Sequence, residues 1–201
     1  MDAAIAIISF VIVTAITPGP NNLLLAASSM RFGSKATIPH LLGIITGFSG
    51  MMMLCALGLG SLFEIFPVAL LILRIVGSVY LIYLAWKIFG FKFDTTADDE
   101  HGDTMAKPLT YVQAVVFQLA NPKAWVMSLT AISLAMPLIG SLLPAIAILF
   151  LCFSTIGIAC NWVWIMLGSV IRQHLHNSRV RNAVNGSLAV LTLLTVGMFW
   201  M

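Results

Sequence analysis

Charged side chains are scarce in this sequence. Lys, Arg, Asp and Glu together make up 8% of the 201 residues, whereas 60% of the residues are hydrophobic. A soluble domain carries about 25% charged residues, which keep its surface hydrated. The composition therefore excludes a soluble protein and predicts an all-α integral membrane protein, because only helices or closed barrels satisfy their own backbone in lipid.

Runs of basic residues and paired cysteines are also missing. Ten Lys and Arg against seven Asp and Glu leave a net charge of +3, and the basic residues are scattered singly, which excludes nucleic acid as a partner. The three cysteines, Cys55, Cys152 and Cys160, form no CxxC pair and lie in apolar stretches, so we interpret them as buried thiols. We expect no metal, no cofactor and no enzyme activity.

Six apolar runs are each long enough to cross a bilayer core, which takes about 20 residues of helix. The first run lacks the basic segment of a signal peptide, so we expect it to be retained as a span. An acidic segment separates the third run from the fourth. The sequence therefore predicts a three-helix repeat over 1–92, an acidic cytoplasmic linker over 93–107 and a second three-helix repeat over 108–201. The runs are residues 3–30, 38–62, 67–89, 111–136, 142–171 and 183–200.

Lys and Arg fall unevenly between the predicted loops. They occur in the first, third and fifth loops and are absent from the second and fourth loops and from both ends of the chain. Basic loops stay in the cytoplasm, so both termini are predicted to lie outside. Three spans in each half mean that the halves enter the membrane from opposite sides. This inverted-repeat arrangement is common among secondary transporters.

Helix-breaking residues interrupt the first and fourth spans. A capping residue followed by proline marks a new helix start, and we expect such starts at Thr17-Pro18 and Asn121-Pro122. Each span then consists of two half-helices, and the positive N-terminus of the second half suits a carboxylate. We expect both breaks to face one central site. The candidate substrate-binding residues are Thr17, Pro18, Gly19, Pro20, Asn21, Asn22, Gln118, Asn121, Pro122, Lys123 and Asn161.

Ionisable residues are few inside the predicted spans. Lys123 follows the second break and lies too far from the cytoplasmic surface to reach it, so we expect it to meet a substrate carboxylate or exchange a proton. His40 is expected at the cytoplasmic interface. Two orientations stay open for Arg74, outward and toward the pathway, and two for Asn161, into the site and toward another helix. No Asp or Glu lies deep in a span, which favours substrates without a cationic side chain.

Three motifs resemble those of the lysine exporter (LysE/RhtB) family of bacterial amino-acid exporters. They are TPGPNN at 17–22, GSVYLIYLAWKIF at 77–89 and FQLANPKAW at 117–125. The resemblance covers essentially the whole chain and implies efflux of amino acids across the bacterial inner membrane, driven by protons. The motifs are most similar to the branch that exports cysteine and O-acetylserine. Threonine, homoserine and leucine stay open as substrates, and so does a homo-oligomeric assembly.

Two other functions are kept as alternatives. Divalent metal efflux would use His40, the cysteines and the acidic linker, and a membrane thiol-redox enzyme would use the cysteines alone. We rank both behind the export of small neutral amino acids by alternating access. The polar groups near the helix breaks are amides and hydroxyls, which are poor ligands for soft metal ions.

Overall fold

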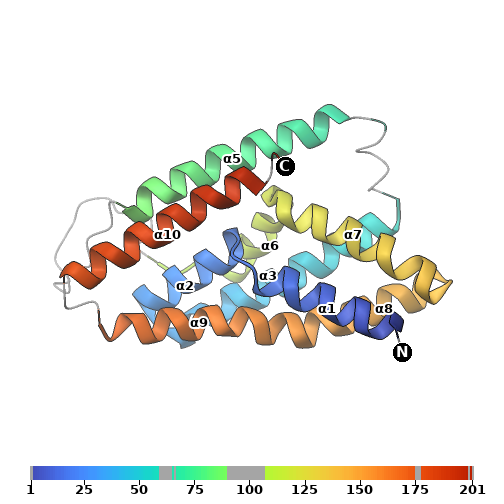
Figure 1. Cartoon of the computed structure of the whole chain (residues 1–201), viewed down its shortest axis with the longest axis horizontal. Coiled ribbons are helices and arrows are strands. Elements are labelled where there is room, and N and C mark those ends of the chain that lie inside the picture. The colour runs from blue at the N-terminus through green and yellow to red at the C-terminus, as the bar shows by residue number, and fades with distance from the viewer. Residues whose placement is uncertain are drawn as a thin grey trace.

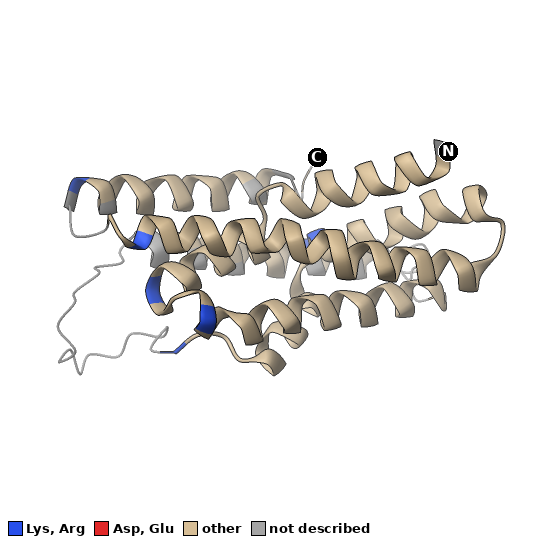
Figure 2. Ribbon diagram, turned by 90° about the horizontal axis from the view of Figure 1, so that it is seen from below, with Lys and Arg blue, Asp and Glu red and all other residues tan. Residues whose placement is uncertain are grey.

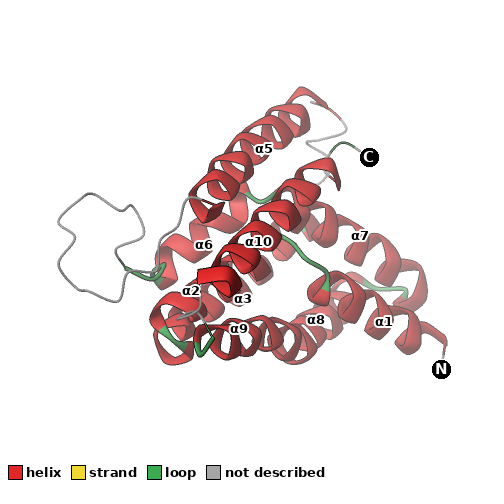
Figure 3. Cartoon of the chain, turned by 60° about the vertical axis from the view of Figure 1, so that its left-hand side comes forward, coloured by secondary structure: helices red, strands yellow, loops and turns green. Residues whose placement is uncertain are grey.

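The computed structural model describes residues 2–58, 65, 67–89, 107–174, 178–198 and 200, and the regular elements in these ranges are helices (Figures 1 and 3). The expectation of an all-α chain is confirmed. The helices are α1 Asp2–Ile16, α2 Pro20–Phe32, α3 Ser34–Ala56, α5 Pro67–Phe89, α6 Tyr111–Ala120, α7 Pro122–Ile139, α8 Leu142–Cys152, the π-helical turn η2 Phe153–Gly157, α9 Ile158–Arg172 and α10 Ser178–Met198.

Three helical stretches among the described residues are long and apolar enough to cross a membrane. They are Ser34–Ala56, Pro122–Ile139 and Leu142–Arg172. The pair α1 and α2, bent by 52° at its break, makes a fourth if it is taken as one span. The full count of six spans and the inverted repeat stay predictions. The predicted linker over 93–107 lies outside the described residues, apart from Lys107.

Most of the Lys and Arg residues that the structure describes lie at one end of the bundle, and the N-terminus lies at the other end (Figure 2). Arg31 lies in the last turn of α2. Arg172, at the end of α9, lies against the α2–α3 turn, since a Cβ at Gly33 would come within 2.8 Å of its guanidinium. The side chains of all seven Asp and Glu residues fall outside the described part of the chain. The described helices therefore carry their charge as cations, mostly at one end.

Glycines allow two helix pairs to pack closely, α3 against α6 and α2 against α9. A Cβ at Gly43 of α3 would come within 2.6 Å of the Ala114 side chain, and one at Gly168 of α9 would overlap the backbone of Ala26. Small residues let helix backbones approach in this way. Gly50, which the sequence places on the same face of α3 as Gly43, has open space beside it. Each pair joins a helix of the first predicted repeat to one of the second.

The helices α5 and α10 pack along each other on one side of the bundle (Figures 1 and 3). The indole N–H of Trp200, just beyond α10, donates to the Ser78 hydroxyl of α5 at 3.0 Å. The pair packs against α2 through Leu81 and Leu188, and it reaches the second break at Gly77, where a Cβ would come within 2.7 Å of Pro122. The third and sixth predicted spans thus lie together, and α5 supports the break before α7.

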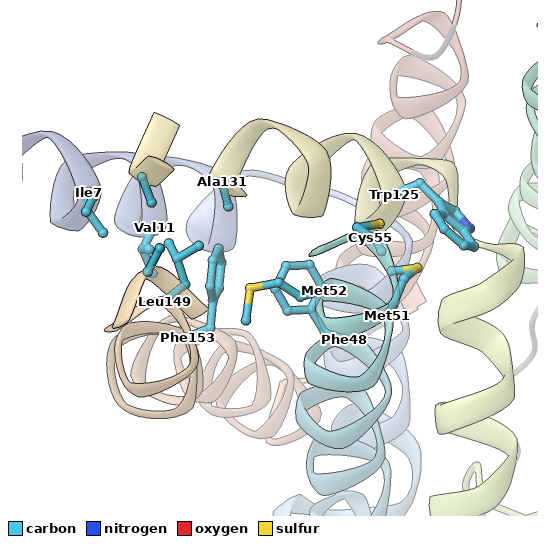
Figure 4. Close-up of a cluster of buried hydrophobic side chains, with 13 residues drawn as sticks. Ile7, Val11, Phe48, Met51, Met52, Cys55, Trp125, Ala131, Leu149 and Phe153 are labelled. Carbon is cyan, nitrogen blue, oxygen red and sulfur yellow. The ribbon is translucent and has the colours of Figure 1, made fainter. Parts of the chain in front are cut away.

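The main hydrophobic cluster joins α1, α3, α7, α8 and η2 (Figure 4). At its centre the rings of Phe48 and Phe153 lie 4.6 Å apart at an interplanar angle of 53°, within the range of favourable aromatic pairs. The flexible side chain of Met52 lies beside these rings, and that of Met51 lies nearer to Cys55 and Trp125 (Figure 4). Both rings also border the cavity at the helix breaks, so one cluster stabilises the fold and shapes the site.

Candidate functional site

The first break separates α1 from α2, and α2 begins at Pro20 with Gly19 as its N-cap. The predicted start at Thr17-Pro18 is therefore wrong. Thr17 directly follows α1 and is bonded to its last turn, because its backbone N–H donates to the Val13 carbonyl at 3.2 Å. Gly19 is extended (φ −169°, ψ 173°), and no side chain caps the amides that follow it. The missing N–H of Pro20 costs nothing at the first helical position.

The second break separates α6 from α7, and here the predicted helix start at Asn121-Pro122 is confirmed. The Asn121 side-chain oxygen accepts the backbone N–H of Lys123 at 3.1 Å, and the Asn121 carbonyl accepts that of Ala124 at 3.0 Å. The expectation that this helix end offers unpaired amides to a carboxylate is therefore wrong. Asn121, as the N-cap, already binds the first amides of α7, which leaves none of them for a ligand.

Side chains bind the last carbonyls of α1, which lose their backbone partners at the break. The Asn22 amide donates to the carbonyls of Ala15 and Thr17, both at 2.8 Å. The indole N–H of Trp164, from α9, donates to the Ile16 carbonyl at 3.1 Å. Sequence reasoning missed Trp164. The signal was available in principle, because a buried indole N–H needs an acceptor.

Lys123 reaches from α7 to the first break. Its Nζ donates to the Thr17 carbonyl at 3.0 Å, to the Thr17 hydroxyl at 2.9 Å and to the Pro18 carbonyl at 3.3 Å. Its side chain lies on Gly19, where a Cβ would come within 2.9 Å of its Cδ. The negative C-terminal end of a helix favours an ammonium. These three acceptors are neutral, and no described side chain is acidic, so the described residues supply no counter-ion for Lys123.

Asn21 and Gln118 join the two breaks through their side-chain amides. Asn21 Nδ2 donates to Gln118 Oε1 at 3.1 Å, and Gln118 Nε2 donates to Asn21 Oδ1 at 3.2 Å. Gln118 is fully buried. The two amides satisfy much of each other's hydrogen bonding. The contact holds the break of α1–α2 against the C-terminal end of α6.

A double-mutant cycle tests this amide pair. We expect Asn21→Leu to lower the free energy of unfolding by about 1–3 kcal/mol, because it leaves the buried amide of Gln118 without its partner. Gln118→Met should lower it less, because the Asn21 amide that loses its partner is half-buried and lines the cavity. The double variant should lower the free energy of unfolding by less than the sum of the two single effects, and the difference should exceed about 0.5 kcal/mol. Denaturant titration of the purified protein measures all four forms. Strictly additive values would show that the two amides do not stabilise each other.

A cavity of about 50 Å³ lies where the two breaks meet. One water needs about 10–15 Å³ on this scale, so the cavity has room for more than one. Predicted site residues at its wall are Gly19, Pro20, Asn21, Asn22, Asn121, Lys123 and Asn161. The predicted residues Thr17, Pro18, Gln118 and Pro122 do not line it. The wall also includes Thr14, Ala15, Ile44, Ile45, Phe48, Ala124, Met127, Phe153 and Gly157, which the candidate set did not contain.

Asn161 is the lining side chain that most needs a ligand. It is 7% exposed, and within the described chain its amide has no hydrogen-bond partner. It follows η2, and such π-helical turns often occur at functional sites. Leaving a buried amide without a partner costs about 1–3 kcal/mol, so this group is expected to bind a solute or a water in the cavity.

The N-terminal end of α2 is the second group of unused donors at the cavity. The backbone N–H groups of Asn21 and Asn22 have no acceptor among the described residues, and both residues line the cavity. Because the start of α2 carries the positive end of its helix dipole, these amides favour an anionic group. The C-terminal end of α1 brings carbonyl oxygens to the same break. One short segment thus presents donors and acceptors together.

His40 and Arg74 do not line this cavity. His40, expected at the interface, is fully buried in the bundle, and neither ring nitrogen has a hydrogen-bond partner in the part that the structure describes. The three cysteines are free thiols. In the same part of the chain, no three His, Cys, Asp or Glu side chains are close enough to hold a metal ion. No observation on these residues therefore favours metal efflux or thiol-redox chemistry.

Comparison with known proteins agrees with the family resemblance of the sequence motifs. A family described as LysE type translocator matches residues 12–201. The cysteine/O-acetylserine efflux proteins of Escherichia coli K12 and Shigella flexneri are each 30% identical to this chain over 168 residues, which is 82% of this chain and 82% of each relative. No solved structure matches the chain.

Proposed function

Since the chain belongs to the LysE-type translocator family, whose matched relatives are amino-acid efflux proteins, we propose that it exports small neutral amino acids from the cytoplasm. One observation carries this proposal. The cavity between the two helix breaks brings unused amides, a lysine ammonium and the unpartnered amide of Asn161 to one place. These groups suit the polar ends of a free amino acid.

The cavity wall limits which side chains fit. Phe48, Met127 and Phe153 form an apolar side, and no lining residue is acidic. A cationic substrate side chain would therefore find no carboxylate at the wall, and burying a second positive charge without a counter-ion is costly. The small volume favours short side chains. Cysteine and O-acetylserine, named for the relatives, are both small and neutral.

Alternating access of two inverted three-helix repeats, 1–92 and 108–201, is the mechanism we propose. The pairs α3–α6 and α2–α9 each join the two halves, and α5–α10 does the same. The end that carries the basic side chains would face the cytoplasm of a bacterial inner membrane, with the termini outside. Protons are the proposed coupling ion, with Lys123 and His40 as candidate carriers.

Efflux from loaded cells tests the function. Cells that express the chain and cells with an empty vector are loaded with dipeptides of cysteine, threonine, leucine or lysine, and the amino acids released outside are followed. We expect the expressing cells to release at least one of them several-fold faster, with lysine release unchanged. Equal release of every amino acid in both strains would refute the proposal.

A further inference from the structure

We propose that in the empty transporter the ammonium of Lys123 occupies the place that the ammonium group of the substrate takes during transport. Substrate binding then exchanges one ammonium for the other. We call the contact of Lys123 Nζ with the oxygens of Thr17 and Pro18 the lysine latch. The inference rests on the proposed function, because it assumes an amino acid in the cavity.

The chemistry of the latch supports this exchange. Its acceptors are two carbonyls and one hydroxyl, which form a receptor for any ammonium group and are not specific for lysine. They lie at the negative end of α1, where a cation is favoured. Within the described chain the Lys123 ammonium is held only by neutral groups, so no counter-ion there offsets the cost of its desolvation. A ligand that supplies a carboxylate would remove this deficit for Lys123.

The broken helix can hold both charges of an amino acid. The carbonyl end of α1 accepts from an ammonium, and the free amides of Asn21 and Asn22 at the start of α2 donate to a carboxylate. An α-amino acid carries both groups on one carbon atom. Thr17 does not itself line the cavity, but Lys123, which binds its oxygens, does. An ammonium that displaces Lys123 therefore enters from the cavity, where the carboxylate of the same ligand can receive the released lysine. Neither a simple amine nor a simple acid satisfies all of these groups.

The exchange also links occupancy to the contact between the two halves. Lys123 belongs to α7 and Thr17 to the end of α1, so the latch joins the two predicted repeats in the absence of substrate. Once a substrate carboxylate binds Lys123, the substrate lies between the halves. Lys123 is then a specificity-determining residue that requires both charged groups in one ligand.

Binding of three related probes tests the exchange. The purified full chain in lipid nanodiscs is titrated under reducing conditions with L-cysteine, with cysteamine, which lacks the carboxylate, and with 3-mercaptopropionate, which lacks the amine. The native chain should bind cysteine at least about tenfold more tightly than either analogue. In Lys123→Met the ratio of cysteine to cysteamine affinity should fall at least about threefold, and the preference that remains is the one given by the amides of Asn21 and Asn22. The matched control Lys35→Met, at an exposed position of α3, should keep the native ratio.

A second variant separates the latch from a purely structural role. The exchange assigns the Thr17 hydroxyl to Lys123 in the empty protein and to the substrate ammonium in the filled one, so in the native background Thr17→Val should change the affinity for cysteine by less than about threefold. In the Lys123→Met background no lysine competes for this hydroxyl, and the same change should weaken cysteine binding by about threefold to tenfold. A purely structural role of Lys123 predicts the same effect of Thr17→Val in both backgrounds. Native discrimination in Lys123→Met, or equal effects of Thr17→Val in the two backgrounds, would overturn the exchange while efflux by the native chain still stands. Failure of the native chain both to bind cysteine and to release any amino acid would overturn the proposed function and this inference with it.

Discussion

Gly168→Ala is expected to lower the free energy of unfolding by about 1–3 kcal/mol, although alanine is the better helix former. A Cβ at this position would overlap the backbone of Ala26, and a backbone cannot move aside as a flexible side chain can. The helices α2 and α9 would have to separate. Denaturant titration of the purified protein, followed by circular dichroism, measures the effect.

Gly50→Ala is the matched control for this packing prediction. Gly50 also lies in a helix, α3, but has no atom within 4 Å of a built Cβ, so alanine there should raise stability by up to about 1 kcal/mol. Both substitutions replace glycine by alanine, but their effects on the free energy of unfolding should have opposite signs. Equal effects at Gly168 and Gly50 would show that α2 and α9 do not pack as closely as the structure has them.

Asn161→Leu is expected to lower amino-acid efflux by at least about tenfold while leaving the free energy of unfolding nearly unchanged. The loss of one hydrogen bond to a charged group of the substrate accounts for the lower flux. Stability should change little because the side-chain amide has no partner among the described residues and lines the cavity, where water can bind it in the empty protein. A loss of flux without a loss of stability is typical of a binding residue. Efflux from loaded cells and thermal unfolding of the purified variant measure the two effects.

Asn182→Leu makes the same exchange at an exposed position of α10 that does not line the cavity. It should leave efflux at the native level. If Asn161→Leu lowered stability together with efflux, the amide would have a structural partner, and its assignment to the substrate would be wrong.

Much of the fold followed from patterns that act locally. The high apolar content predicted an all-α chain, and the asparagine before Pro122 predicted the start of α7, because a capping side chain and a proline act on their own helix. The same rule failed at Thr17-Pro18. Two prolines there allow a helix to begin at either one, and the contacts that keep Thr17 on α1 decide for Pro20. At this break the local sequence pattern is ambiguous, and the contacts of Thr17 in the folded protein decide where α2 begins.

The role of each site residue depended on distant partners. Asn21 was expected to bind the substrate through its side chain, but that side chain pairs with Gln118, 97 residues away. Lys123 was expected at the site and does line the cavity, but it crosses to Thr17. The sequence contains the hydrogen-bond donors and acceptors, but it does not show which donor pairs with which acceptor when the two are far apart in the chain.

The sequence by itself determined that this protein is helical and membrane-embedded, that its first span contains helix breakers and that a new helix begins at Pro122. Composition and neighbouring residues are enough for these properties, because lipid demands internal backbone hydrogen bonds and proline lacks an N–H. Only the tertiary structure decided that α2 keeps free amides while α7 does not, that Asn161 lacks a partner and that Phe48 and Phe153 border the cavity. Apolar side chains occur throughout this sequence, and only their positions in the packed bundle decide which of them line the cavity.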